Sequence, residues 1–343
     1  RKVMHLIKKI KFLIVCGLSI SSIAFSAMAA DVTLIISSWA PPSHGMNASM
    51  FPKLIKMMEE ATEGRVTAKI KYKLGSPPAQ FDLIQDGVAD ITWIFHGYNP
   101  GRYVATKVVE LPGYAGSAKA ASIAYWKAHQ KFFATANEHK GVKLIGLMTH
   151  GPGQLHSARK VTSLSEIQGM KLRLGGGVSG DVGDALGATG IRVPAPKVYE
   201  TLASKAADGV MMPMEAKKGF KLTEVAQNTY IMPGGFYRGS FAVIMNQEKF
   251  NSLSAKDQNA LNGVFGLPLS TMAGRVWDSI DGAGFGVTKA ASDNSINHAS
   301  SIDQAEFGKM SKKIVTKVLK EVSAKGVDGR AAQTFIAAEM AKF

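Results

Sequence analysis

The chain has 343 residues, of which 46% are hydrophobic and 20% are charged, and it carries a formal net charge of +15. These fractions are typical of folded globular proteins and argue against a disordered, fibrous or multi-span membrane protein. The length indicates about two domains.

The first 30 residues have the pattern of a secretory signal peptide. The basic segment RKVMHLIKKIK precedes the apolar run FLIVCGLSISSIAF, and small residues follow at Ala27 and Ala29. A single-span anchor is the competing interpretation, but the run is shorter than the roughly 20 residues needed to cross a bilayer. We therefore predict cleavage near Ala29 or Ala30 and a soluble mature protein in the periplasm.

Charge and cysteine content narrow the expected partners. Residues 1–30 hold five basic and no acidic residues, so their removal lowers the net charge from +15 to +10. The remaining basic residues are spread along the chain without an RNA-binding or zinc-finger signature, so nucleic acid is not expected as a partner, whereas small anions are. The only cysteine, Cys16, lies in the apolar run, which leaves the exported part without a disulfide or a cysteine metal site. The bulky Val15 argues against a lipid anchor on Cys16.

From Asp31 onward, short strands alternate with helices, which is typical of an α/β fold with largely parallel sheets. In chain order we expect a strand at 31–39, a helix at 46–61, a strand at 65–73, a helix near 77–87, a strand at 89–95, a helix at 117–137 and an apolar strand at 142–149.

A second α/β unit follows a polar, glycine-containing crossing. It comprises a strand at 170–174, a glycine-rich loop, a helix at 178–186, a strand at 190–193, a helix at 196–209 and a strand at 210–213. The apolar strand expected at 239–246 resembles those of the first unit, and long helices then dominate to the C-terminus.

The segment LRLGGGVSG meets the GxGxxG spacing of a dinucleotide loop through Gly175, Gly177 and Gly180, with Glu200 twenty residues beyond. A plain tight turn is the favoured interpretation, because the segment lies in mid-chain and the chain has 35 glycines. A glycine loop that leads into a helix still points backbone N–H groups toward an approaching anion.

Arg173 lies two residues before this loop, at the carboxyl end of a strand, where α/β folds bind their ligands. Its guanidinium offers a planar fork of donors that matches a carboxylate. A solvated strand arginine is the alternative, and position alone favours it.

Signatures of metal binding and catalysis are missing from the sequence. The eight histidines form no HExxH pattern, and there is no GxSxG elbow, P-loop or paired acidic motif. We therefore expect no metal and no cofactor, and a catalytic function is disfavoured. Aromatic residues that stand where strands end suit the wall of a pocket, namely Trp93, Phe95, Tyr98, Phe236 and Tyr237.

The segment KLRLGGGVSGDVGDALGATGIRVPAPKVYETLASKAADGVMMPMEAKKGFKLTEVAQ resembles the DctP-type solute-binding proteins of tripartite ATP-independent periplasmic (TRAP) transporters. The resemblance continues through LIGLMTHGPGQLHSARKVTSLSEIQGMKLR, LGSPPAQFDLIQDGVADITWIFHGYNPGRY and PGGFYRGSFAVIMN, so it covers nearly all of the chain after residue 30. It implies an extracytoplasmic receptor that delivers a small organic acid to the membrane subunits of a TRAP transporter.

The resemblance also implies a fold like that of periplasmic binding proteins. Two α/β domains, joined by crossing strands and a long helix, would hold the ligand in the cleft between them. We expect the first domain to comprise 31–152 with about 239–278, and the second 153–238 with about 279–343.

Three positions define the ligand that the resemblance implies. Arg173 matches the family arginine that binds the ligand carboxylate. Gly153, in a GPG turn, fills the place where other members carry a second arginine, so a second anionic group is not expected. Met212 replaces a common ligand-contacting asparagine and makes that wall apolar, which argues against sialic-acid-like ligands. We predict a monocarboxylate with an apolar or aromatic part, with or without a hydroxy or keto group.

The predicted walls of this pocket are Trp93, Tyr98, Met212, Phe236 and Tyr237. Glu215 and His156 are candidate partners for a hydroxyl, keto or amino group on the ligand, although Glu215 could equally accept from the free N–H groups of a helix start after Pro213.

Two rival functions stay open. One is an exported enzyme acting on organic acids with His156 or Glu215 as general base, and the other is a ligand-sensing partner of a receptor kinase.

Overall fold

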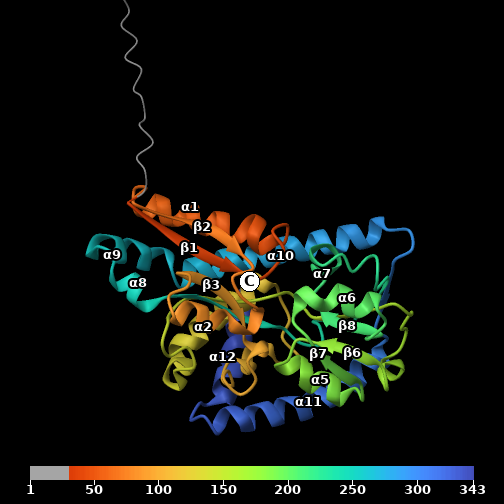
Figure 1. Cartoon of the computed structure of the whole chain (residues 1–343). Coiled ribbons are helices and arrows are strands. Elements are labelled where there is room, and N and C mark those ends of the chain that lie inside the picture. Colours follow the sequence, from red (N-terminus) through yellow and green to blue (C-terminus); the bar gives the residue numbers. More distant parts are fainter. Residues whose placement is uncertain (1–30) are drawn as a thin grey trace, which may run out of the picture.

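The computed structural model describes residues 31–343, and the predicted signal peptide lies outside them. The described residues form two β-sheets surrounded by helices (Figure 1). In spatial order, the first sheet contains β2 (Val66–Tyr72), β1 (Val32–Ser38), β3 (Ile91–Phe95), β10 (Ser240–Met245) and β4 (Lys143–Thr149). The second contains β11 (Ser295–His298), β9 (Asn228–Ile231), β5 (Gln154–Ser157), β8 (Gly209–Met212), β6 (Lys171–Leu174) and β7 (Thr189–Arg192).

Helices cover both sheets. They are α1 (Phe51–Ala61), α2 (Gln80–Gln85), α3 (Lys107–Glu110), α4 (Ala118–Ala128), α5 (Val178–Ala185), α6 (Val198–Ala203), α7 (Ala216–Gly219), α8 (Gln247–Asn251), α9 (Ala255–Val264), α10 (Leu267–Ala290), α11 (Ser301–Ser323) and α12 (Gly329–Met340). Within residues 31–343, none is both long and apolar enough to cross a membrane.

The first predicted helix illustrates how the sequence pattern becomes packing. A π-helical turn at Met46–Met50 leads into α1, and Met46, Met50, Leu54 and Met58 are all fully buried. Their spacing places them on one face, which packs into the core of the first sheet. The chain leaves the helix through Gly64, whose φ of +83° favours glycine.

The sheets are mixed rather than largely parallel, which corrects the expectation from the sequence. β1 pairs in parallel with β2 and β3, whereas β10 runs antiparallel to β3 and β4. In the second sheet, β5 runs antiparallel to β8 and β9. The chain enters β5 straight from β4 in the other sheet, and it enters β10 straight from the other sheet as well. Neither strand therefore follows a helical crossover, which parallel neighbours require.

The two sheets are joined by crossing segments and a long helix, as the resemblance implied. The crossings run side by side, because the Gly153 N–H donates to the Tyr237 carbonyl at 2.8 Å and the Phe236 N–H donates to the Gly153 carbonyl at 2.9 Å. Helix α10 packs against α4 and β4 of the first unit and against α7 of the second. The exact domain boundaries remain a prediction, and α12 packs against α4 although it follows residue 279.

Three strands of the second sheet were not predicted, namely β5, β9 and β11. Each has only four residues. β5 was taken as part of a polar crossing, and β11 carries the mostly polar sequence SINH at the sheet edge. Such short segments show no periodicity and depend on their neighbours for pairing.

Candidate ligand-binding site

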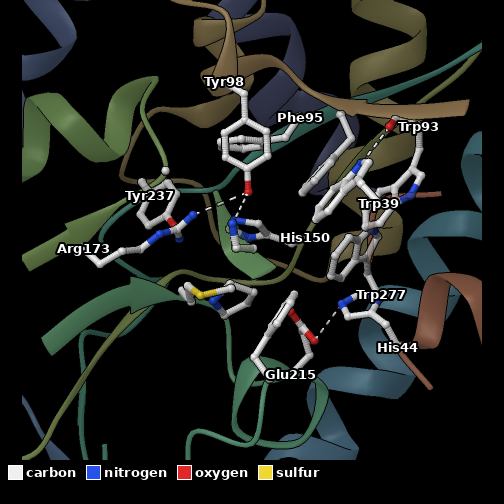
Figure 2. A pocket seen from close by; sticks show the side chains of 16 residues that line it. Trp39, His44, Trp93, Phe95, Tyr98, His150, Arg173, Glu215, Tyr237 and Trp277 are labelled. Carbon is white, nitrogen blue, oxygen red and sulfur yellow. Dashed lines mark hydrogen bonds and ion pairs between the residues drawn. The ribbon is translucent and has the colours of Figure 1, made fainter. Parts of the chain in front are cut away.

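A cavity lies between the two sheets, beside the crossing segments (Figure 2). About 400 Å³ of space there is free of protein atoms, including space that is open to solvent. The lining residues are Trp39, His44, Trp93, Phe95, Tyr98, His150, Arg173, Gly175, Ala195, Met212, Pro213, Glu215, Phe220, Tyr237, Phe241 and Trp277.

The wall from the first unit is built of aromatic rings. Trp39 and Trp93 stack with ring centroids 4.1 Å apart, and Phe241 stacks on Trp93 at 5.6 Å. The Trp39 indole N–H donates to the Trp93 carbonyl at 2.9 Å, and the Trp93 indole N–H donates to Ser38 Oγ at 2.9 Å. Because the protein already satisfies both indole N–H groups, these two rings offer mainly apolar faces to a ligand.

The wall from the second unit carries the charge. Arg173, on β6, is only 3% exposed, and its Nε donates to the Val193 carbonyl at 2.8 Å. Its Nη2 lies 3.5 Å from Tyr98 Oη. Among residues 31–343, no carboxylate lies within 4.0 Å of the Arg173 side-chain nitrogens. The guanidinium is therefore a buried cation that still has N–H groups available to bind a ligand carboxylate.

Tyr98 links the two units across the cavity. It follows β3 in the first unit, and its hydroxyl oxygen accepts from the Ala195 N–H of the second unit at 2.8 Å. Burial raises the pKa of Tyr98, so the phenol is neutral. Its ring also packs edge-on against Phe95 at 4.8 Å.

A histidine–carboxylate pair forms the other polar part of the lining. His44 Nε2 lies 3.2 Å from Glu215 Oε2, with side chains 1% and 3% exposed. The N–H of Met46 donates to His44 Nδ1 at 3.2 Å, so the neutral ring carries its proton on Nε2, which faces Glu215.

The crossing segments contribute His150 and Tyr237. Burial lowers the pKa of His150 to about 3, so this imidazole is neutral at physiological pH. The Tyr237 hydroxyl donates to the Met211 carbonyl at 3.0 Å. A Cβ on Gly153 would lie 2.3 Å from the Tyr237 ring, so an arginine at position 153 has no room without displacement of Tyr237.

Seven residues that the sequence analysis placed in a pocket or its walls line this cavity: Trp93, Phe95, Tyr98, Arg173, Met212, Glu215 and Tyr237. His156 and Phe236 do not line it. The ring nitrogens of His156 bond Thr229 Oγ1 and the Met212 carbonyl, both at 3.0 Å, and burial lowers its pKa to about 3. Phe236 instead packs in the hydrophobic core against Phe307, with ring centroids 5.0 Å apart.

Several lining residues escaped the sequence analysis, above all Trp39, His44, Phe220, Phe241 and Trp277. Trp39 directly follows β1, so the rule that ligands gather at carboxyl ends of strands could have found it. Trp277 lies inside α10, where no local signal separates a cavity residue from a core residue.

The glycine loop before α5 is occupied by the protein's own carboxylate. The Val178 N–H donates to Glu110 Oε2 at 2.9 Å, and a Cβ on Gly177 would lie 2.3 Å from the same oxygen. Burial raises the pKa of Glu110 to about 7. The Val178 N–H at this helix start thus faces an internal carboxyl group, which agrees with the turn interpretation rather than with a dinucleotide loop.

Comparisons with known proteins agree with this architecture. A structure of a TRAP periplasmic solute-binding protein from Bordetella bronchiseptica, with bound (R)-mandelate and (S)-mandelate, is 36% identical, covers 90% of this chain and 99% of its own, and has a TM-score of 0.87. A TRAP solute-binding protein from Rhodoferax ferrireducens, in complex with copurified benzoate, is 26% identical with 90% and 98% coverage and a TM-score of 0.84.

Two further relatives broaden the comparison. A marine metagenome TRAP solute-binding protein in complex with 3-hydroxybenzoate is 27% identical, with 92% and 99% coverage and a TM-score of 0.85. The outer membrane transporter protein TsaT of Comamonas testosteroni is 25% identical over 330 residues, covering 94% of this chain and 96% of its own.

The family model described as bacterial extracellular solute-binding protein, family 7 (DctP), matches residues 36–321. Since this match spans most of the chain, the protein belongs to the DctP family of bacterial extracellular solute-binding proteins.

Proposed function

We propose that this protein captures a small aromatic monocarboxylate in the periplasm and delivers it to the membrane subunits of a TRAP transporter. The observation that carries the proposal is the buried Arg173, which faces a cavity of aromatic rings and has no carboxylate partner among the described residues. A buried cation without a counter-ion is costly, and a ligand carboxylate removes that cost in the bound state.

Two features favour one carboxylate rather than two. Gly153 sits against the Tyr237 ring and leaves no room there for a second arginine. Glu215 adds a negative charge to the lining, and a like charge on the ligand would be repelled in this poorly solvated space.

The relatives support the aromatic part of the proposal. Mandelate, benzoate and 3-hydroxybenzoate, the ligands of the three related structures, each combine one carboxylate with one aromatic ring. The stacked Trp39 and Trp93 with Phe241 offer flat apolar surfaces of the kind that such rings require.

A thermal-shift titration tests the proposal with a matched pair of compounds, benzoate and its neutral isostere benzamide. Binding to the folded state stabilises it by RT ln(1 + [L]/Kd), about 2.7 kcal/mol at a hundredfold excess over Kd. We expect benzoate to raise the unfolding temperature and benzamide to have little effect. Equal shifts from both compounds, or no shift from any member of a panel of aromatic acids, would contradict the proposal.

The rival enzyme hypothesis has lost one candidate base. His156 does not line the cavity, and burial keeps its pKa near 3, which makes it a weak base. Mass spectrometry of ligand recovered after incubation separates the two functions, because a receptor returns its ligand unchanged. Neighbouring genes for membrane subunits separate a transport role from service to a receptor kinase.

A further inference from the structure

The His44–Glu215 pair has acceptor capacity that the protein does not use. Both side chains are almost fully buried, and Glu215 belongs to the cavity lining. A carboxylate offers about four acceptor positions. Among residues 31–343, His44 is the only side chain in polar contact with this carboxylate, and no backbone N–H donates to it. Because the carboxylate borders the cavity, a ligand can reach its remaining acceptor positions.

Aromatic rings make up most of the surroundings of the pair. His44 lies 5.2 Å from Phe220, 5.8 Å from Trp93 and 6.0 Å from Trp277, measured between ring centroids. Water is a poor competitor in such an apolar setting, so a donor on the ligand is worth more here than at an exposed carboxylate.

Helix α10 holds both members of the pair in place. Asp281 Oδ1 accepts from the Glu215 backbone N–H at 2.8 Å. A Cβ on Gly284 would lie 2.0 Å from the Met214 carbonyl oxygen, and a Cβ on Gly45 would lie 2.3 Å from Ile280, so both glycines permit close contact with this helix. The carboxylate is therefore positioned before any ligand arrives, which lowers the cost of recognition.

Gly219 has no side chain, and this leaves the room that the His44–Glu215 pair occupies. A Cβ on Gly219 would lie 2.5 Å from Glu215 Oε2 and 3.1 Å from a ring carbon of His44. Arg173 and Glu215 meanwhile enter the cavity from different sides (Figure 2). One ligand can therefore present its carboxylate to Arg173 and a second group to Glu215.

We propose that the His44–Glu215 pair is a second polar subsite that selects ligands bearing a hydrogen-bond donor, an O–H or N–H group, remote from the carboxylate. This inference rests on the proposed function, because it takes the carboxylate at Arg173 as given. Glu215 accepts the donor, and the His44 Nε2–H keeps the carboxylate oriented. A second carboxylate at this place is rejected by charge.

Calorimetric titrations with ligands that differ by one group test the subsite. The probes are benzoate against 3-hydroxybenzoate and 3-aminobenzoate, and phenylacetate against 3-hydroxyphenylacetate, with 3-methoxybenzoate as the ether that lacks the donor. We expect at least one donor-bearing acid to bind about tenfold tighter than its parent, as a hydrogen bond to a charged group allows. The methoxy compound should show no such gain.

The variant Glu215→Gln keeps the shape and removes the charge. This variant should still bind the parent acid, but it should prefer the donor-bearing acid by less than about threefold. It should also bind the dicarboxylate isophthalate more tightly than wild type does, because the repelling charge is gone. Glu200→Gln is the matched control, because Glu200 is an exposed glutamate that pairs with Lys197 on the protein surface. It should leave all the affinities unchanged.

The outcomes separate this inference from the function on which it rests. If the parent acids bind through Arg173 but wild type prefers no donor-bearing member, or Glu215→Gln keeps the preference, the subsite is refuted and the receptor function stands. If no aromatic acid binds at all, the proposed function fails and the inference fails with it. Should Glu215→Gln not fold, the wild-type comparisons alone decide.

Discussion

The two walls of the cavity differ in chemistry. The first unit contributes rings from β1, β3 and β10 and the segments that follow them, including Trp39, Trp93 and Phe241. The second unit contributes both charges, Arg173 and Glu215. A ligand that needs a flat apolar face and a counter-charge can satisfy both needs only by touching both walls. Affinity and closure of the cleft are therefore expected to depend on each other.

The largest effect on ligand affinity should follow from the loss of the positive charge of Arg173 on the second wall. Arg173→Ala should weaken the binding of benzoate about a hundredfold or more, because the ligand carboxylate is left buried and unpaired. Arg173→Lys should retain only part of the wild-type affinity for benzoate, since lysine keeps the charge but lacks the planar fork of donors. Titration calorimetry measures both affinities.

The matched control for Arg173 is Lys171→Ala, an exposed position on the same strand, which should bind as wild type does. Circular dichroism should report a native fold for all three variants. An Arg173→Ala protein that is folded and retains wild-type affinity would remove Arg173 from the site.

The second effect concerns the place where the two units touch beside the cavity. Gly176 has a φ of +95°, and a Cβ there would lie 2.2 Å from the Gly97 carbonyl oxygen of the other unit. Gly176→Ala should hold the units apart, and a smaller population of the closed form should weaken binding about tenfold.

Gly169→Ala separates this contact from simple backbone strain. Gly169 also has a positive φ, +78°, but a Cβ on this residue would have no other atom within 4 Å. Both variants should lose about 1 kcal/mol of stability from the left-handed backbone. Only Gly176→Ala should lose affinity, and equal losses in the two variants would argue against the contact as a determinant of closure.

A smaller effect is expected at the hydroxyl that spans the cavity. Tyr98→Phe removes the acceptor for the Ala195 N–H and the neighbour of Arg173 Nη2. One hydrogen bond of this kind contributes about 1 kcal/mol, so we expect an affinity loss of about fivefold in calorimetry. Tyr199→Phe, at an exposed tyrosine that bonds Glu224, is the control and should change nothing. Equal affinities for Tyr98→Phe and wild type would exclude a role for this hydroxyl.

The smallest expected signal is the change in overall size. Ligand that touches both walls should favour the closed form and reduce the radius of gyration in small-angle scattering. Tryptophan emission should change in the same titration, because Trp39, Trp93 and Trp277 line the cavity. An unchanged scattering profile at saturating ligand, with binding confirmed by calorimetry, would count against a hinge.

The sequence predicted the aromatic and charged parts of the site unequally. Trp93 could be named because it lies near the end of an apolar strand, where α/β folds place ligands. The position of Arg173 favoured a solvated arginine, and only the resemblance to the DctP family assigned it to the ligand carboxylate. His44 could not be named, because it lies in an irregular segment and acquires its role only through contact with Glu215, 171 positions later in the chain. Trp277 was missed for a similar reason, since no local pattern inside α10 indicates that this residue borders a cavity.

The same limit applies to the fold. The apolar strands β3, β4 and β10 were predicted because all or most of their residues are buried. Their order in the sheet was not, since it depends on pairing between segments that are distant in sequence. His156 was placed wrongly for this reason. Its strand β5 was taken as a loop, whereas its ring forms hydrogen bonds within the second sheet and does not line the cavity.

The position of β10 constrains the order in which the protein can fold. This strand lies between β3 and β4, yet it comes after every strand of the second sheet except β11. Until residue 245 is available, the facing edges of β3 and β4 have no central strand to pair with. Exposed edges of this kind recruit other chains, so the N-terminal half alone should aggregate. The first sheet therefore cannot be completed until most of the second sheet has been synthesised, although the structure has two separate sheets.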